Sequence, residues 1–79
     1  MANSRSAKDL HCTFQVVWQE SRHRYEVHGD EGELHGFSSN QDTAIGMAQR
    51  EATRTEREGK KPIICIEQKD GGFKTTSLF

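Results

Sequence analysis

The sequence predicts an α+β domain with two layers, in which one helix packs on one face of an antiparallel sheet of four to five strands. Residues 39–59 combine N-terminal capping residues, an alanine stripe at helical spacing and a terminal glycine. The segments on both sides alternate apolar and polar residues with the period of a strand. We expect the order β-β-β-α-β-β in a single domain over residues 11–79, after a disordered polar arm at residues 1–10.

The first three strands are predicted before the helix. Residues 12–19 alternate apolar and polar side chains, and residues 22–28 do so again after a short turn, as in a hairpin. The Gly-Asp-Glu-Gly sequence at residues 29–32 indicates a turn. Residues 33–37 then form a shorter third strand, which Gly36 interrupts.

The helix is expected to begin at Ser39, since Asp42 three residues later resembles a capping box and suits the positive end of the helix dipole. Gly59 can supply the left-handed residue that ends a helix. Gly46 lowers helix stability, so we expect it to mark a close contact between helix and sheet. The stripe that packs on the sheet consists of Ala44, Met47, Ala48 and Ala52.

The fourth strand is predicted at residues 62–66, where a proline precedes the sequence Ile-Ile-Cys-Ile. A strand that is apolar on both faces is either covered on both sides or paired across a subunit interface. We therefore expect Ile64 and Ile66 to form a dimer or partner strand. Residues 69–72 indicate a turn, and residues 73–79 a final strand.

Composition limits the class of protein. The chain has 79 residues, of which 32% are hydrophobic, and a core of this size favours self-association. Its net charge of -1 weighs against a protein that wraps nucleic acid. No apolar run approaches the length of a membrane span, and the first residues do not resemble a leader, so we expect a cytoplasmic protein without membrane contact.

The two cysteines, Cys12 and Cys65, lie in separate strands. A secreted disulfide scaffold usually carries more cysteines than this. We expect both to be buried thiols that act as small apolar residues, and whether they are adjacent stays open.

No catalytic constellation is found in the sequence. The histidines at positions 11, 23, 28 and 35 do not have the paired spacing of a zinc site, although His28 and His35 can face each other across a hairpin. Nucleophilic catalysis needs a cysteine or serine beside a base and an orienting group. Cys12 and Cys65 have the pattern of buried residues, and Ser38 and Ser39 are better explained as helix-capping residues. We therefore expect no enzyme activity, no catalytic residue, no cofactor and no metal.

Arginines provide the main alternative. Arg50, Arg54 and Arg57 form a stripe on the helix, and Arg22 and Arg24 lie on the polar side of the second strand. If the two sets adjoin, they can hold phosphates. The glutamates between the helical arginines favour a solvated, salt-bridged surface instead. Phe14, Trp18 and Tyr25 suggest either a stacking platform for bases or core residues.

Several short motifs together resemble a known family. These are Tyr25-Glu26-Val27, the capped helix with its alanines, the Ile-Ile-Cys-Ile strand and the Asp70-Gly71 turn. They are similar to small bacterial proteins of the domain of unknown function numbered 2188, in which a hairpin precedes such a helix. The helix start has one extra residue relative to that family. The resemblance implies the fold and carries no catalytic residues.

A second resemblance is to HicB-type antitoxins, which share strands that lead into an alanine-containing helix. Their Leu-Pro-Gly-Cys stretch is replaced here by His35-Gly36-Phe37. The favoured function is a non-enzymatic module that binds a protein partner or a second copy of itself. The alternatives are a nucleic-acid-binding module and a phage or mobile-element inhibitor of a host nucleic-acid machine.

Overall fold

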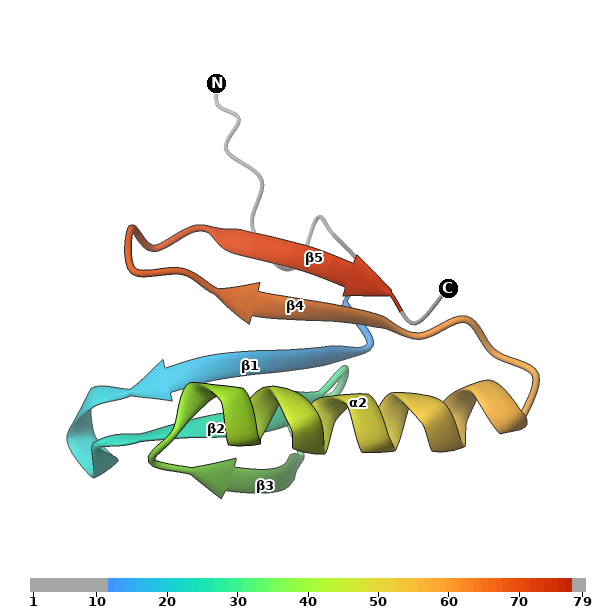
Figure 1. The fold of residues 1–79 in the computed structure, drawn as a ribbon, viewed down its shortest axis with the longest axis horizontal. Helices are drawn as coiled ribbons and strands as arrows, with labels where there is room; N and C mark the ends of the chain where they lie inside the picture. The colour runs from blue at the N-terminus through green and yellow to red at the C-terminus, as the bar shows by residue number, and fades with distance from the viewer. Residues whose placement is uncertain (1–11, 78–79) are drawn as a thin grey trace.

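The computed structural model describes residues 12–77, and for residues 76 and 77 the backbone only. Within this range a helix lies across one face of a five-stranded sheet (Figure 1). The α+β class and the order of the elements are confirmed. Along the chain these elements are β1 (Phe14–Gln19), the 3-10 turn η1 (Glu20–Arg22), β2 (Arg24–Gly29), β3 (Leu34–Ser38), α2 (Gln41–Arg57), β4 (Ile63–Glu67) and β5 (Phe73–Ser77).

The sheet has the strand order β3-β2-β1-β4-β5, so β1 lies at its centre. The pairs β1–β2, β2–β3 and β4–β5 are antiparallel, as expected. The pair β1–β4 is parallel, with Phe14 opposite Ile64, and here the predicted antiparallel sheet needs correction. The connection through α2 returns the chain to the end at which β1 begins, so β4 runs in the same direction as β1.

The core lies between α2 and the sheet. Alternate strand residues point to one face, and the register places Val16 beside Val27, so their apolar side chains meet under the helix. The helix supplies three alanines, whose small side chains permit close approach to the strands. The buried cluster consists of Phe14, Val16, Val27, Ile64 and Ile66 from the sheet and Ala44, Ala48 and Ala52 from α2.

The helix begins one residue later than predicted. Asn40 is the N-cap, and its side-chain oxygen accepts a hydrogen bond from the backbone N–H of Thr43 at 3.1 Å. Ser38 in turn accepts from the backbone N–H of Asn40, which fixes the entry of the chain. At the other end, Gly59 has a φ of +89°, as expected for the residue that ends the helix.

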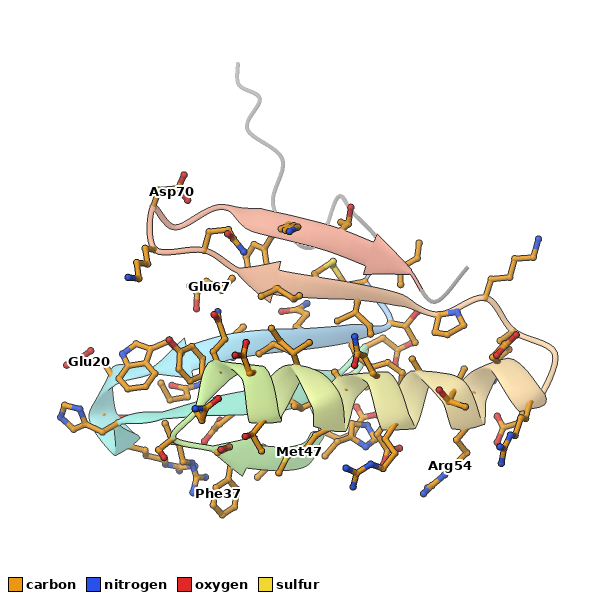
Figure 2. The ribbon with its side chains drawn as sticks, in the orientation of Figure 1. Glu20, Phe37, Met47, Arg54, Glu67 and Asp70 are labelled. Atoms are coloured by element: carbon orange, nitrogen blue, oxygen red, sulfur yellow. A yellow bond between two sulfur atoms is a disulfide. The ribbon has the colours of Figure 1, made fainter. Side chains whose placement is uncertain are left out.

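Two glycines differ from expectation. Gly46 lies on the side of α2 away from the sheet, and a Cβ added there would meet nothing within 4 Å. The close contact occurs instead at Gly36 in β3, where an added Cβ would lie 3.0 Å from the sulfur of Met47. The absence of a side chain at Gly36 thus allows Met47 to pack between α2 and β3 (Figure 2).

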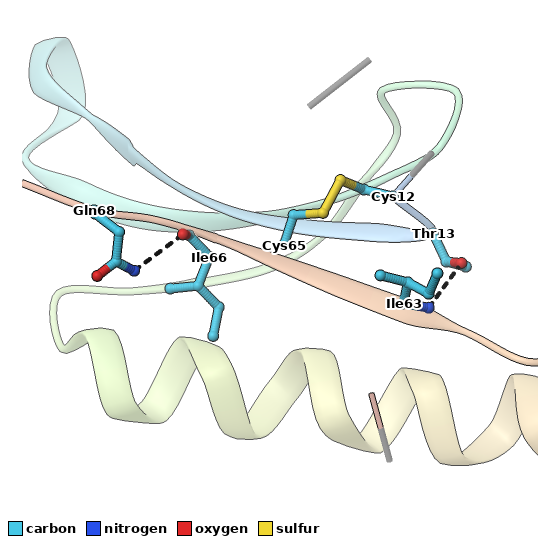
Figure 3. Close-up of a disulfide and its surroundings, with 6 residues drawn as sticks. All are labelled: Cys12, Thr13, Ile63, Cys65, Ile66 and Gln68. Atoms are coloured by element: carbon cyan, nitrogen blue, oxygen red, sulfur yellow. Dashed lines mark hydrogen bonds between the residues drawn. A yellow bond between two sulfur atoms is a disulfide. The ribbon is translucent and has the colours of Figure 1, made fainter. Parts of the chain in front are cut away.

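Ile64 and Ile66 lie in the core, which corrects their expected role in a dimer or partner strand. Their exposed fractions are 0% and 7%, and both pack in the cluster under α2. Figure 3 shows the Ile66 side chain on the helix side of β4. The other face of β4 presents Ile63 and Cys65. A partner cannot reach the two predicted residues unless the domain opens.

The cysteines form a disulfide, which corrects the prediction of free thiols. Cys12 and Cys65 are bonded on the sheet face opposite α2, with 5.8 Å between their Cα atoms (Figure 3). The parallel pairing brings them together, since the ladder extends beyond β1. Thr13 donates its backbone N–H to the Ile63 carbonyl at 2.9 Å, and its hydroxyl accepts from the Ile63 N–H at 3.1 Å.

Some predictions lie outside the described residues. These are the polar arm at residues 1–10, His11, and the last two residues of the predicted final strand. Within the part of the chain that is described, no helix combines the length and the apolar character needed to cross a membrane.

Candidate functional site

The sheet face opposite α2 contains a buried carboxylate. Glu26 in β2 is 3% exposed, and one of its oxygens accepts from Arg24 Nε at 2.8 Å and Arg22 Nη1 at 3.3 Å. The other oxygen lies 2.8 Å from His28 Nε2. We call these four residues the Glu26 cluster. It forms because residues two apart in a strand share a face, so Arg24, Glu26 and His28 stand in a row.

The cluster stabilises the ionised form of Glu26. The hydrogen bond with His28 lowers the pKa of Glu26 most, burial opposes this, and Arg24 and Arg22 lower it further, to about 2 from an ordinary 4.5. This depression corresponds to about 3 kcal/mol. Solvent around the largely exposed Arg22 screens the charges, so we take about 1–2 kcal/mol as the net contribution.

Acid is therefore expected to weaken the domain through Glu26. The folded-state pKa lies below the unfolded one, so this contribution is complete above pH 4.5 and disappears as the pH falls towards 2. Urea unfolding at a series of pH values should show a loss of about 1–2 kcal/mol from this group. The variant Glu26→Gln, which cannot lose a charge, should show a correspondingly shallower acid dependence. Identical pH profiles for the two proteins would contradict the assignment.

The five arginines of the predicted basic face lie on two separate surfaces. Arg24 lies on the sheet face opposite α2, and Arg22 reaches into the same cluster from η1. The stripe of Arg50, Arg54 and Arg57 lies on α2 opposite its buried alanines, and Figure 2 shows Arg54 pointing away from the strands. Glu26 also neutralises part of the charge of Arg22 and Arg24. The arrangement thus offers no continuous basic surface from these five residues.

The two histidines considered from the sequence as a facing pair, His28 and His35, lie on opposite faces of the sheet. His28 binds Glu26 on the outer face, whereas His35 turns towards α2, where its ring contacts Phe14 edge-on with 5.3 Å between the centroids. The irregular register between β2 and β3 accompanies this divergence. Among residues 12–77, no group of three or more histidines, cysteines and carboxylates is placed to hold a metal ion.

The edge strand β3 carries the two most exposed large apolar side chains of the described chain. Leu34 is 48% exposed and Phe37 is 50% exposed. They pair with His28 and Glu26, so both stand on the outer face, and Phe37 projects at the free edge of the sheet (Figure 2). The guanidinium of Arg24 lies 3.8 Å from the centre of the Phe37 ring and holds it in place.

A hollow of about 390 Å³ lies beside the N-terminal end of α2. Its aromatic wall consists of Trp18, which is 37% exposed, and Tyr25, whose ring meets the indole edge-on at 4.8 Å. We call it the Trp18 pocket. Its polar lining comes from α2 and from the end of β4 with the following turn, namely Gln41, Glu67, Gln68 and Lys69. Of the three aromatic residues considered from the sequence, Phe14 is the one in the core.

A second hollow, of about 400 Å³, lies beside the C-terminal end of α2 and is lined mainly by charged residues of both signs. His35 contacts Glu33 at 3.1 Å and Glu51 at 3.8 Å, and Arg54 lies 3.8 Å from the same Glu51 oxygen. The lining mixes acidic and basic side chains, so it does not present a single sign of charge to a ligand.

No family model matches the chain, and no similar curated protein or solved structure was found. The resemblances to the bacterial family of unknown function and to HicB-type antitoxins therefore stay predictions.

Sequence reasoning missed the Glu26 cluster and the exposed β3 pair. The cluster has a local signal, since the alternation Arg24, Glu26, His28 places one acid between two basic groups on the same face. The exposure of Leu34 and Phe37 has none, because it depends on β3 being an edge strand and on both side chains standing on the sheet face opposite α2.

Proposed function

We propose that the protein is a small non-enzymatic binding module that acts through protein–protein contact at β3. The observation that carries this proposal is the pair of exposed apolar side chains, Leu34 and Phe37, on an edge strand. An edge strand presents unpaired backbone groups, and proteins commonly protect such edges with lysine or proline. The sequence of β3, Leu-His-Gly-Phe-Ser, contains neither, and the register irregularity next to β2 is the protective feature at this edge among the described residues.

The occupant that fits β3 best is a second copy of the chain. The strand contains no Asp, Glu, Lys or Arg, so antiparallel pairing of two copies places no like charges opposite each other. A two-fold axis would join two five-stranded sheets into one and bring the exposed apolar side chains of both copies to the same interface. Such pairing also adds burial to a small core.

Replacing Phe37 by Asp is expected to weaken this association by about 100-fold or more, because each dimer would then bring two carboxylates into the interface. Size-exclusion chromatography with light scattering over a concentration series measures the effect. Thr75→Asp, an exposed position on the other edge strand β5, is the matched control and should leave the association unchanged.

A protein that stays monomeric at every concentration would contradict pairing with a second copy. A pull-down from nuclease-treated lysate then tests the broader proposal, with Phe37→Asp as the comparison. If a captured protein binds both forms equally, β3 is not the binding surface. If nucleic acid instead shifts with the protein and binding weakens steeply with salt, the alternative of a nucleic-acid-binding module is favoured.

The compartment is part of the same proposal. The sequence favours the cytoplasm, whereas disulfides such as Cys12–Cys65 persist mainly in oxidising compartments. A cytoplasmic location therefore requires that the bond be open or protected in the cell. Thiol labelling of the protein, trapped rapidly in acid from its native cells, distinguishes the two states.

A further inference from the structure

The Trp18 pocket has the composition of a site for a positively charged nitrogen group. We propose that it binds an ammonium or guanidinium group, such as the side chain of a basic residue. Its volume of about 390 Å³ falls within the usual range for small-ligand sites. This proposal is independent of strand pairing at β3, since the pocket is formed by Trp18, Tyr25 and the β4–β5 turn.

The aromatic wall favours a cation because the face of an aromatic ring carries negative potential. The indole of Trp18 is held between two neighbours, Tyr25 at 4.8 Å and His23 at 6.1 Å between ring centroids. Its N–H donates to Glu20 at 2.7 Å, so the one hydrogen-bond donor of the ring is already used. The wall is therefore in place before a ligand binds. It has no unused indole N–H group that could donate a hydrogen bond to an anion.

The polar lining presents acceptors. Glu67 accepts the backbone N–H of Trp18 through one oxygen at 2.8 Å, and this fixes the carboxylate beside the ring while its second oxygen keeps acceptor capacity. Gln41 donates its amide to the Glu67 carbonyl at 3.4 Å, and Gln68 donates to the Ile66 carbonyl at 3.1 Å (Figure 3). The side-chain amide of each glutamine thus donates one N–H to a backbone carbonyl, while its own carbonyl oxygen can still accept a hydrogen bond from a ligand. Acceptors of this kind suit a ligand with several N–H groups.

Lys69 is the opposing feature, since its ammonium belongs to the same lining. Lys69 belongs to the turn between β4 and β5, and its ammonium is carried on a long and flexible side chain. If the pocket takes a cation, Lys69 repels the ligand and its removal strengthens binding. If the pocket takes an anion, Lys69 is the main attraction and its removal abolishes binding. A cation site and an anion site therefore predict opposite effects of replacing Lys69 by a neutral residue.

Trp18 is the one tryptophan of the chain, so its fluorescence reports on this pocket directly. The probe is Nα-acetyl-arginine methylamide, compared with the neutral glutamine and anionic glutamate analogues. We expect a saturable change with the arginine compound alone, at a dissociation constant of about 1 mM or tighter. A short peptide with one arginine distinguishes the sources, because tighter binding than the single amino acid points to a protein ligand.

Three variants test the assignment. Glu67→Gln keeps an acceptor for the Trp18 N–H and should weaken arginine binding by about tenfold or more, whereas Lys69→Gln should strengthen it. Glu56 is an exposed residue of α2 that does not line the pocket. Glu56→Gln is therefore the control for net charge and should not change arginine binding. Equal binding of the glutamine compound, loss of binding in Lys69→Gln, or no binding by the wild type would each overturn the proposal.

Discussion

Opening the Cys12–Cys65 disulfide is expected to lower the free energy of unfolding by about 4 kcal/mol. The bond joins residues 53 apart in the sequence, so it removes much conformational freedom from the unfolded chain. A domain of this length has a total stability on the order of 4–12 kcal/mol. Reduction should therefore leave the protein marginally folded. Urea unfolding with and without a thiol reductant measures the difference.

The double variant Cys12→Ala/Cys65→Ala is the control for this experiment. It should have the stability of the reduced wild type, apart from the small loss of packing, and should not respond to reductant. Mass spectrometry after thiol alkylation verifies that reduction is complete. Complete alkylation without any loss of stability would show that the bond contributes nothing to the fold.

Ile64→Ala is expected to lower the free energy of unfolding by about 2–5 kcal/mol. Ile64 is fully buried under α2, and truncation would leave a cavity between the helix and the central strands. The oligomeric state of the folded protein should stay unchanged, because the side chain does not reach the surface. Urea unfolding and light scattering together separate these two effects.

The neighbouring Ile63 offers a matched comparison. It has the same chemistry, belongs to the opposite face of β4 and is only partly buried. Ile63→Ala should therefore cost clearly less than Ile64→Ala. If Ile64→Ala instead dissociated a dimer while the folded monomer kept its stability, the sequence-based interpretation of this strand as an interface would be correct.

The local structure was predictable because its determinants are close in sequence. The alternation of β1 and β2 predicts their pairing, and the alanine stripe with Gly59 predicts the helix and its end. The N-cap was misplaced because Ser38, Ser39 and Asn40 are all good capping residues, and only the backbone decides among them. A one-residue error of this kind does not alter the face that packs.

The sites depend on contacts between distant segments, which a single sequence does not reveal. The parallel β1–β4 pairing brings Cys12 to Cys65, and the same pairing directs Ile64 to the helix side. The arginine stripe on α2 was predictable from its spacing, yet its relation to Arg24 depends on which face of the sheet the helix covers. The Trp18 pocket likewise combines residues from four separated segments.

The central position of β1 also determines the order in which the molecule can fold. Its hairpin partner β2 follows at once in the chain, but its other neighbour, β4, is made about fifty residues later. During synthesis, the apolar side chains of β1 and β2 that later pack under the helix therefore stay exposed to solvent until α2 and β4 have been made. The same long separation applies to the two cysteines, so the Cys12–Cys65 bond ties the start of the central strand to a segment that is synthesised much later.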